Sequence, residues 1–322
     1  MPAVVFAPVT LLDYQIQLPN STIVGYQSAS GVLFSSLTGL RDLPQVRTGD
    51  LEKGSIDGMY PGLNLLGLRS LVIQWDTTGA VVPVETALQT LSGALQSVPD
   101  PTAVVMTAGD YLRQQAGIGA VKPISAIAVK LPGRTYPTLL FGRPVKHATK
   151  LDQQYQFGQA KPTTQWDCPD GAIYDFTTVT GTCGLPSPTS GLVWGSGWPW
   201  SWGSSTGGSF TLNNTGSYYA TPYFVVKGPC TNPVITNQAT GQYIALNITL
   251  GATDVLTVDT QSGVVTLNQT ATAAPNRNGA VRVGSTYFRV AAGTTTIGFS
   301  SSDSTAVTGT LTGYLLPTSS TI

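Results

Sequence analysis

This sequence of 322 residues has few charges: only 10% of its residues are Asp, Glu, Lys or Arg, and its 16 basic and 16 acidic residues cancel. The zero net charge excludes a polybasic nucleic-acid-binding protein. Disorder caused by charge repulsion is also excluded, because 41% of the residues are hydrophobic and can form a core. Charged residues that usually cover helix surfaces are scarce, whereas Thr and Val are abundant. The composition therefore favours a protein built mainly from strands.

Histidine and cysteine are also scarce. A Ser-His-Asp catalytic site would have to use His147, the only histidine, which lies in a basic stretch. The three cysteines, Cys168, Cys183 and Cys230, form no CxxC pair, and with one histidine they give no zinc-binding set. We expect free thiols in a reducing cytosol, with a Cys168–Cys183 disulfide as the alternative.

Long apolar runs, targeting signals and cofactor motifs are missing as well. No apolar run approaches 18 residues, and the first basic residue is Arg41, so we expect no membrane segment and no secretory signal. No Walker motif appears, and no GxGxxG loop stands between a strand and a helix. The sequence therefore predicts no catalytic residues, no metal ligands and no cofactor.

The first half of the sequence predicts several strands and one helix. Apolar residues recur every three or four positions over residues 83–98, which is typical of a helix with one buried face. Residues 43–69 are rich in Gly, Asp and Pro and predict a long structured loop. Strands are predicted at residues 14–18, 71–76, 103–106, 124–131 and 138–141.

The composition changes at about Lys161. Residues 161–209 are dense in Pro, Gly, Trp and Ser and predict a connecting region with little regular structure. The rest predicts a β-sandwich, because short strands follow one another with turns between them. These strands are expected at residues 243–250, in a hairpin of 254–259 with 264–268, near residues 282, 288 and 297, and at 307–315. We therefore expect a first domain at 1–160, a crossover at 161–209 and a sandwich domain at 210–322.

Four tryptophans lie close together in the crossover. Two interpretations are open: the rings pack between the two domains, which we favour, or they form a flat surface that contacts sugar. The residues concerned are Trp194, Trp198, Trp200 and Trp202.

The charges are unevenly distributed along the sequence. Residues 42–110 contain eight acidic residues, whereas residues 111–151 contain seven basic residues and no acid. The two segments either pair within one domain or meet across a boundary between subunits. The candidate residues for such a subunit interface are Arg113, Lys122, Lys130, Arg134, Arg143 and Lys146.

Several motifs, taken in order, resemble those of siphophage distal tail proteins. In the C-terminal half these are GPCTNPVITN at 228–237, TGQYI at 240–244 and DVLTVDT at 254–260. In the N-terminal half, PQVR at 44–47 with the later Asp57, Gly62 and Arg69 is similar to a loop of that family. Asp167-Cys168-Pro169, followed by Tyr174, looks like the family's crossover.

The resemblance implies a mainly β protein with an N-terminal split β-barrel, which contains one helix, and a C-terminal galectin-like β-sandwich. It implies a structural virion protein of the tail tip or baseplate, assembled in the cytoplasm of the host bacterium, and not an enzyme. The implied partners are other copies of the chain in a hexameric ring, the tail tube protein and the tail-tip hub protein, with the tape measure protein as a further candidate. The last strand, at 307–315, is expected in either domain. The alternative function is a carbohydrate-binding tail adhesin that uses the tryptophan-rich segment.

Overall fold

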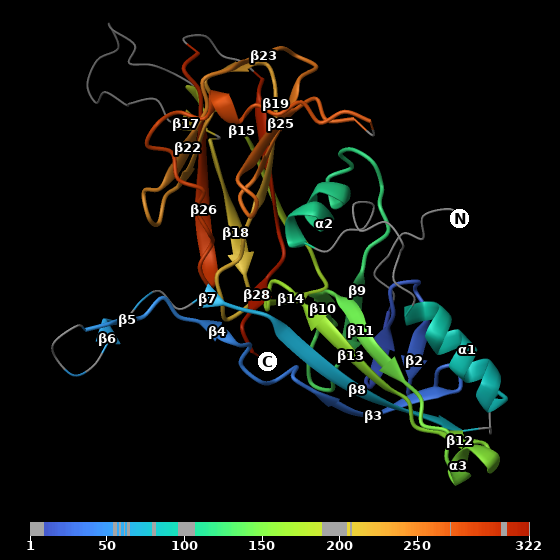
Figure 1. Ribbon diagram of the computed structural model, residues 1–322. Helices are drawn as coiled ribbons and strands as arrows, with labels where there is room; N and C mark the ends of the chain where they lie inside the picture. Colours follow the sequence, from blue (N-terminus) through green and yellow to red (C-terminus); the bar gives the residue numbers. More distant parts are fainter. Residues whose placement is uncertain are drawn as a thin grey trace, which may run out of the picture. The chain divides into compact units, whose positions relative to one another are not determined.

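The chain forms two compact units, each assembled from separate pieces of the sequence (Figure 1). The first contains Met1–Thr107, Val121–Thr177 and Thr318–Ile322, and the second contains Ala108–Ala120 and Thr178–Pro317, so the chain passes between the units four times. These units are defined by contacts, and the chain changes unit after residues 107, 120, 177 and 317. The domain limits expected at residues 160 and 209 stay a prediction. The structure is a computed structural model that describes residues 10–53, 57, 59–60, 62, 65–78, 82–95, 107–188, 205–206, 208–270, 272–303 and 308–321.

The first unit contains a six-stranded antiparallel sheet in the order β2-β1-β9-β10-β14-β28. The strands predicted at 14–18, 124–131 and 138–141 are confirmed as β1, β9 and β10. Ile16 lies opposite Val129, and both side chains are fully buried, which gives the sheet a core-facing side. The strands are β1 (Gln15–Gln17), β2 (Ile23–Gly25), β9 (Ala126–Lys130), β10 (Thr138–Phe141), β14 (Ile173–Asp175) and β28 (Thr318–Ser319).

A second antiparallel sheet of this unit has the order β11-β13-β8-β12, with β3 also paired to β8. Along β8, the buried residues Leu71, Ile73 and Trp75 alternate with exposed ones, which confirms the strand predicted at 71–76. In the described part of the chain these two sheets do not close into a barrel, as expected of a split barrel. The strands are β3 (Val32–Thr38), β8 (Arg69–Thr78), β11 (Arg143–Ala148), β12 (Gln159–Ala160) and β13 (Thr163–Cys168).

Helix α1 (Val84–Leu95) confirms the helix predicted at 83–98 over its described residues. Its buried side chains include Ala87, Leu91 and Leu95, and the helix contacts β8 and β3. The apolar stripe therefore covers the sheet. A single further turn, α3 (Gln153–Gln156), begins with an Asp152 side chain that accepts a hydrogen bond from the Gln154 backbone N–H.

The described residues of 46–66 form two short strand pairs of a hairpin, within the segment 43–69 that the sequence predicted to be a long structured loop. Strand β4 (Val46–Arg47) pairs with β7 (Leu65–Leu66), and farther out β5 (Leu51–Glu52) pairs with β6 (Met59–Tyr60). At the base, the Gly67 N–H donates to the Gln45 carbonyl. We call this element the hairpin arm; it runs out from the sheets at the left of Figure 1. Paired strands of two residues are too short to show periodicity, which is why the pattern predicted a loop.

The second unit contains the predicted β-sandwich. One sheet has the order β15-β27-β19-β24-β25 and the other β18-β26-β21-β22, and their side chains share one buried core. The predicted hairpin is confirmed as β24 and β25. The strands are β15 (Val179–Gly184), β18 (Ser209–Asn214), β19 (Tyr223–Lys227), β21 (Val234–Asn237), β22 (Tyr243–Ala245), β24 (Val255–Asp259), β25 (Val264–Leu267), β26 (Gly293–Ser300) and β27 (Thr310–Leu315), with the small pairs β16 (Ser187–Pro188) with β17 (Ser205–Thr206) and β20 (Cys230–Thr231) with β23 (Thr249–Leu250).

Helix α2 (Ala108–Gln115) belongs to the second unit, although it precedes β9 in the sequence. The sequence did not predict it. A signal was present, because Ala108, Tyr111 and Leu112 are spaced as one helix face and all three are buried. The helix contacts β19 of the sandwich.

Three further expectations were wrong in detail. The described part of 161–209 is not mainly irregular, because β13, β14 and β15 lie there. Along β13, Thr164, Trp166 and Cys168 are buried in alternation with less buried residues. The single strand predicted at 243–250 is two strands, β22 paired with β21 and β23 paired with β20. Near residues 282 and 288 the structure has only the isolated bridges Leu246–Val281 and Ala220–Val290.

The end of the chain joins both units. The strand predicted at 307–315 is β27, which pairs with β15 and β19 in the sandwich. Only three residues later, β28 pairs with β14 in the first unit. The strand predicted at 307–315 thus belongs to the sandwich, and the short strand that follows it belongs to the first unit.

Some expectations lie outside the described residues, namely the strand at 103–106 and all four tryptophans of the crossover. Both interpretations of those tryptophans stay predictions. None of the helices in the described ranges has the length and apolarity that a membrane-spanning helix needs.

Candidate assembly surfaces

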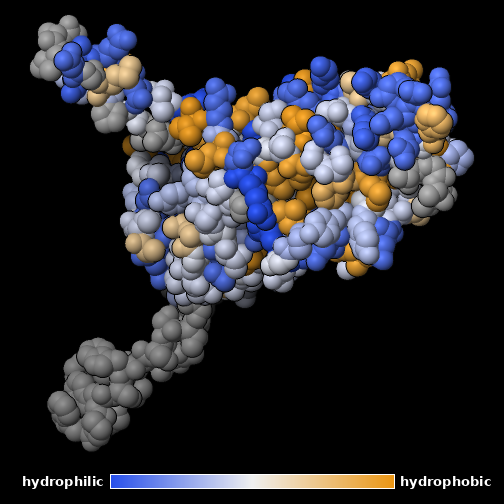
Figure 2. Space-filling view, turned by 90° about the horizontal axis from the view of Figure 1, so that it is seen from below, coloured by the Kyte–Doolittle hydropathy of each residue, from blue (hydrophilic) through white to orange (hydrophobic). Residues whose placement is uncertain are grey.

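The hairpin arm exposes apolar side chains that a chain on its own would be expected to cover. Leu51 is 69% exposed and Tyr60 61%, and Val46, Met59 and Leu65 are exposed as well. Figure 2 shows the arm at upper left, standing apart from the rest of its unit. A two-stranded hairpin without further packing is only marginally stable in water. These apolar side chains are therefore largely open to solvent; among the described residues, Lys53 Nζ lies 5.3 Å from the centre of the Tyr60 ring.

Arg69 fixes the base of this arm. It lies between β7 and the body of β8, and its guanidinium is buried, with 1% of the residue exposed. Its Nε donates to the Gly171 carbonyl at 3.0 Å, and its Nη1 donates to the carbonyl of Asp42 at 2.8 Å. The two terminal nitrogens of the guanidinium also donate to the backbone carbonyls of Gly39, Leu40 and Ser320.

The Arg69 network joins the segments on both sides of the arm to the C-terminal segment. The carbonyls at residues 39–42 precede the arm and Arg69 itself follows it. Burial lowers the pKa of the guanidinium, partly offset by the neighbouring Cys168, Asp42 and Asp170. The sequence had only placed Arg69 in a family-like motif; its structural role depends on residues up to 251 positions away.

Strand β11 presents the exposed cations of the predicted subunit interface. Arg143 and Lys146 are both exposed, as is Val145 between them. Among the described strands β11 pairs only with β13, which leaves it at an edge of the sheet. Pro144, a register shift and Lys146 all disfavour pairing of this edge with another strand. A contact here would therefore use side chains and not a continued backbone ladder.

Two other candidate cations have carboxylate partners in their own unit. Arg134 Nη2 lies 2.5 Å from Asp175 Oδ1, and both side chains are largely buried. Lys130 lies 3.9 Å from Asp13 and donates to the Arg134 carbonyl. Lys122 is half-buried. Lys130 and Arg134 therefore have partners in their own unit, but Asp13 and Asp175 lie outside the acidic segment 42–110, so both interpretations of the two charged segments stay predictions.

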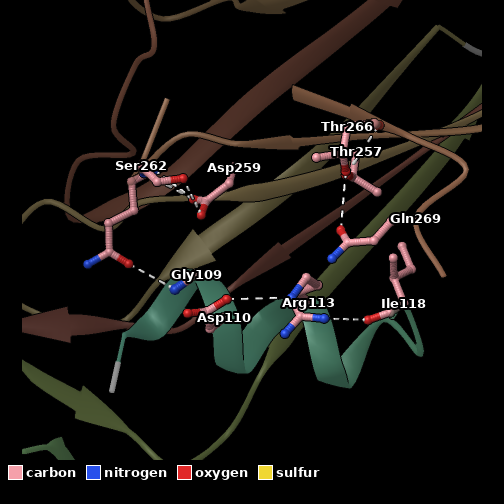
Figure 3. Close-up of polar contacts among 10 residues, drawn as sticks. Gly109, Asp110, Arg113, Ile118, Thr257, Asp259, Ser262, Thr266 and Gln269 are labelled. Atoms are coloured by element: carbon pink, nitrogen blue, oxygen red, sulfur yellow. Dashed lines mark hydrogen bonds and ion pairs between the residues drawn. The ribbon is translucent and has the colours of Figure 1, made fainter. Parts of the chain in front are cut away.

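Arg113 lies on α2 and is 7% exposed. Its Nε lies 3.5 Å from Asp110 Oδ1, and its Nη1 donates to the Ile118 carbonyl at 2.9 Å (Figure 3). These contacts hold the helix and the turn that follows it. Little of the side chain is left for a neighbouring subunit to contact.

The start of α2 is bound to the β24–β25 turn. The Gly109 N–H donates to Gln261 Oε1 at 2.8 Å, and Asp259 orders the turn by accepting from Ser262 (Figure 3). A Cβ on Gly109 would lie only 2.6 Å from an oxygen of Asp259. Burial raises the pKa of Tyr111 on the helix, and of Tyr223 on β19, to about 12. A helix from the N-terminal half of the sequence thus packs on the sandwich and belongs to that unit.

No catalytic arrangement is found at the remaining candidate residues. His147 Nδ1 lies 2.9 Å from Thr164 Oγ1, and burial lowers the pKa of the imidazole. The cysteines are buried free thiols whose pKa values burial raises. Within the described residues no three His, Cys, Asp or Glu side chains are grouped to hold a metal ion.

Comparison with known proteins gives one family match. Residues 215–312, which form most of the sandwich, match the siphovirus-type tail component, C-terminal domain. A search of curated proteins gives no match.

One solved structure shows the same fold over nearly the whole chain. The crystal structure of phage SPP1 Dit (gp 19.1), described as a paradigm of hub adsorption apparatus in phages that infect Gram-positive bacteria, is 12% identical. It has a TM-score of 0.55 over 93% of this chain and 97% of that chain. A chain of the phage P2 baseplate in its activated conformation with Ca is 11% identical, with a TM-score of 0.45 over 95% and 98%. The family match and the shared SPP1 Dit fold confirm the resemblance of this chain to siphophage distal tail proteins, which are structural proteins of the tail tip and baseplate.

Proposed function

We propose that this chain is the adaptor between the tail tube and the tail-tip hub of a siphophage, and that it works as a hexameric ring without enzymatic activity. The partners are other copies of itself, the tail tube protein and the hub protein, with the tape measure protein as a further candidate. The family match and the distal-tail fold support the adaptor role. The hairpin arm supports assembly and is the observation that carries the proposal.

The arm is suited to reach a neighbouring copy. A ring of identical subunits uses two different surfaces of each copy, so one surface has to project to the next. The arm projects, exposes Leu51 and Tyr60, and has its base fixed by Arg69. Burying each of these two apolar side chains contributes about 2 kcal/mol.

The charges give the receiving surface. The arm has an excess of acidic residues, because Asp50, Glu52 and Asp57 are exposed and its only described cations are Arg47 and Lys53, whereas β11 presents Arg143 and Lys146. We therefore propose that the arm of one copy lies against the β11 edge of the next. Exposed ion pairs add only about 0–1 kcal/mol each, so these charges mainly orient the subunits and speed their encounter.

Native mass spectrometry of the full chain tests the ring. We expect about six copies for the unchanged chain and monomers for the double variant Leu51→Ser, Tyr60→Ser. Loss of both contacts weakens each interface by roughly a thousandfold. The matched control is Val283→Ser, which removes a fully exposed apolar side chain of the sandwich unit and should leave the ring intact.

Two outcomes would reject the proposed ring contact. One is a chain that stays monomeric at the concentrations at which tails assemble. The other is a double variant that forms the same ring as the control. The adaptor role is tested separately by binding the ring to purified tail tube and hub proteins, and turnover of peptidoglycan or polysaccharide by the pure chain would disprove the absence of enzymatic activity.

A further inference from the structure

The sandwich unit contains a pocket that the adaptor role does not use. It has a volume of about 470 Å³, which lies within the range of roughly 300–1,000 Å³ typical of small-molecule sites. It lies where β21 ends, β22 begins and β26 begins. The side chains that matter most are Tyr219, Asn237, Thr240, Gln242, Tyr287 and Arg289.

The polar groups of this pocket have unused hydrogen-bonding capacity. Among the described residues, the Tyr219 hydroxyl and the Arg289 guanidinium have no hydrogen-bond or ion-pair partner. Gln242 uses its Oε1 to accept from the Thr240 hydroxyl at 3.3 Å, which leaves its amide nitrogen free to donate. Three donors from different segments of the chain therefore line one open space and have no hydrogen-bond acceptor among the described residues.

The aromatic part of the pocket is an exposed ring. Tyr219 is 56% exposed and is held by an edge contact with Tyr218, with ring centroids 5.8 Å apart. The second tyrosine, Tyr287, is half-buried against the sandwich core. One accessible ring beside amide and hydroxyl groups suits a ligand that has an apolar face and polar edges, which describes a pyranose sugar.

The charge of the pocket narrows the ligand class further. Arg289 is the only charged residue that lines the pocket, and no acidic side chain lines it. An unpaired guanidinium binds carboxylate and phosphate groups strongly, because it donates to two of their oxygens at once. A cationic ligand would be repelled by Arg289, and a purely apolar ligand would leave the polar groups of the lining without partners, so binding of both is disfavoured.

We propose that this pocket binds a saccharide unit that carries a carboxylate or a phosphate, with the sugar on the Tyr219 ring and the anion against Arg289. The Gln242 amide donates to a sugar hydroxyl. The site is independent of the ring proposed above, because all of its residues lie in the sandwich unit.

Calorimetric or NMR titration of the purified full chain tests the pocket with five probes. These are glucuronic acid, glucose 6-phosphate, glucose, inorganic phosphate and AMP, each up to about 10 mM, a range that detects weak binding. We expect at least one charged sugar to bind about tenfold more tightly than glucose or phosphate. Which of the two binds distinguishes a carboxylate ligand from a phosphate ligand.

Two variants and a control complete the test. Arg289→Gln should reduce the affinity for the charged sugar about tenfold, to the level of glucose. Tyr219→Ala should weaken glucose and the charged sugar alike. The control is Arg282→Gln, which removes an exposed cation outside the pocket and should change nothing. All three side chains are exposed, so unchanged melting temperatures are expected.

The proposal is overturned if neither charged sugar binds, or if Arg289→Gln binds the charged sugar as the unchanged chain does. Equal affinity for inorganic phosphate and glucose 6-phosphate would show a simple anion site and reject the saccharide. Tighter binding of AMP than of both charged sugars would assign the pocket to nucleotides instead.

Discussion

Replacing Arg69 with Met should loosen the base of the hairpin arm and leave the sandwich unchanged. The substitution keeps an apolar stem of similar length but removes every hydrogen bond of the guanidinium. Two of the carbonyls that lose a donor, those of Gly171 and Leu40, belong to buried hydrogen bonds. The others are partly exposed and can accept from water.

The size of the effect follows from the buried carbonyls. A buried group that loses its partner costs about 1–3 kcal/mol, so Gly171 and Leu40 together account for roughly 2–6 kcal/mol. The variant no longer buries a charge, which offsets part of this cost. We therefore expect a net loss of about 2–4 kcal/mol, below the upper end of that sum. Such a loss is a large share of the stability of an ordinary domain.

Hydrogen exchange followed by mass spectrometry measures this loss segment by segment. Peptides that cover residues 39–42, 168–173 and 318–321 should exchange faster by roughly one to three orders of magnitude, because each factor of ten corresponds to about 1.4 kcal/mol. Peptides from β24 and β25 should be unaffected. Arg69→Lys, which keeps the charge with a single donor nitrogen, should recover only part of the protection.

The control for this experiment is Arg47→Met, at an exposed arginine of the arm. We expect it to change stability by no more than about 0.5 kcal/mol. If Arg69→Met exchanges and melts like this control, the buried guanidinium does not hold the base of the arm, and the inference drawn from its hydrogen bonds is wrong.

Four further variants test other parts of the structure. Leu91→Asp puts an unpaired charge under α1, where the leucine is fully buried, and should cost several kcal/mol, seen as a lower melting temperature; an unchanged melting temperature would contradict the packing. The double variant Arg143→Glu, Lys146→Glu should slow ring formation in stopped-flow light scattering, with the difference shrinking as salt rises, because exposed charges are screened. Arg134→Glu should instead mainly destabilise the fold, since its partner lies within its own unit; equal assembly rates for the double variant and the unchanged chain would exclude the β11 contact. Gly109→Val should detach the start of α2, because a Cβ there would lie 2.6 Å from a carboxylate oxygen, and slow exchange over residues 108–115 in this variant would refute that role.

Local pattern was enough to predict the elements that are periodic over their whole length. The helix at α1 and the β24–β25 hairpin were found because each buries one face of a continuous segment. The hairpin arm was missed because its strands have two residues each. The sequence also gave no means of predicting that α2 packs on the sandwich, since the partners Gly109 and Gln261 are 152 residues apart.

The charge pattern was informative only after its pairings were known. The excess of cations over residues 111–151 predicted one basic surface, but the structure distributes them among three environments. Arg113 is buried on α2, and Arg134 is paired with a carboxylate 41 residues away. Arg143 and Lys146 remain exposed on β11. Only the register of the sheets decides which cations find a partner within the chain.

An exposed cation without a partner indicates a ligand site only together with its surroundings, because Arg282 is exposed as well and lies outside the pocket. Arg289 differs from it by lining the pocket together with the exposed Tyr219 ring. Arg289 stands 70 residues beyond Tyr219 in the sequence, and the two share a pocket only because the sandwich brings their loops together. A cation with a carboxylate partner in its own unit, such as Arg134, has a structural role. A cation without such a partner is available to a ligand or to a neighbouring subunit. By this criterion the sugar pocket and the β11 edge are independent sites, and a variant at either one should leave the other unchanged.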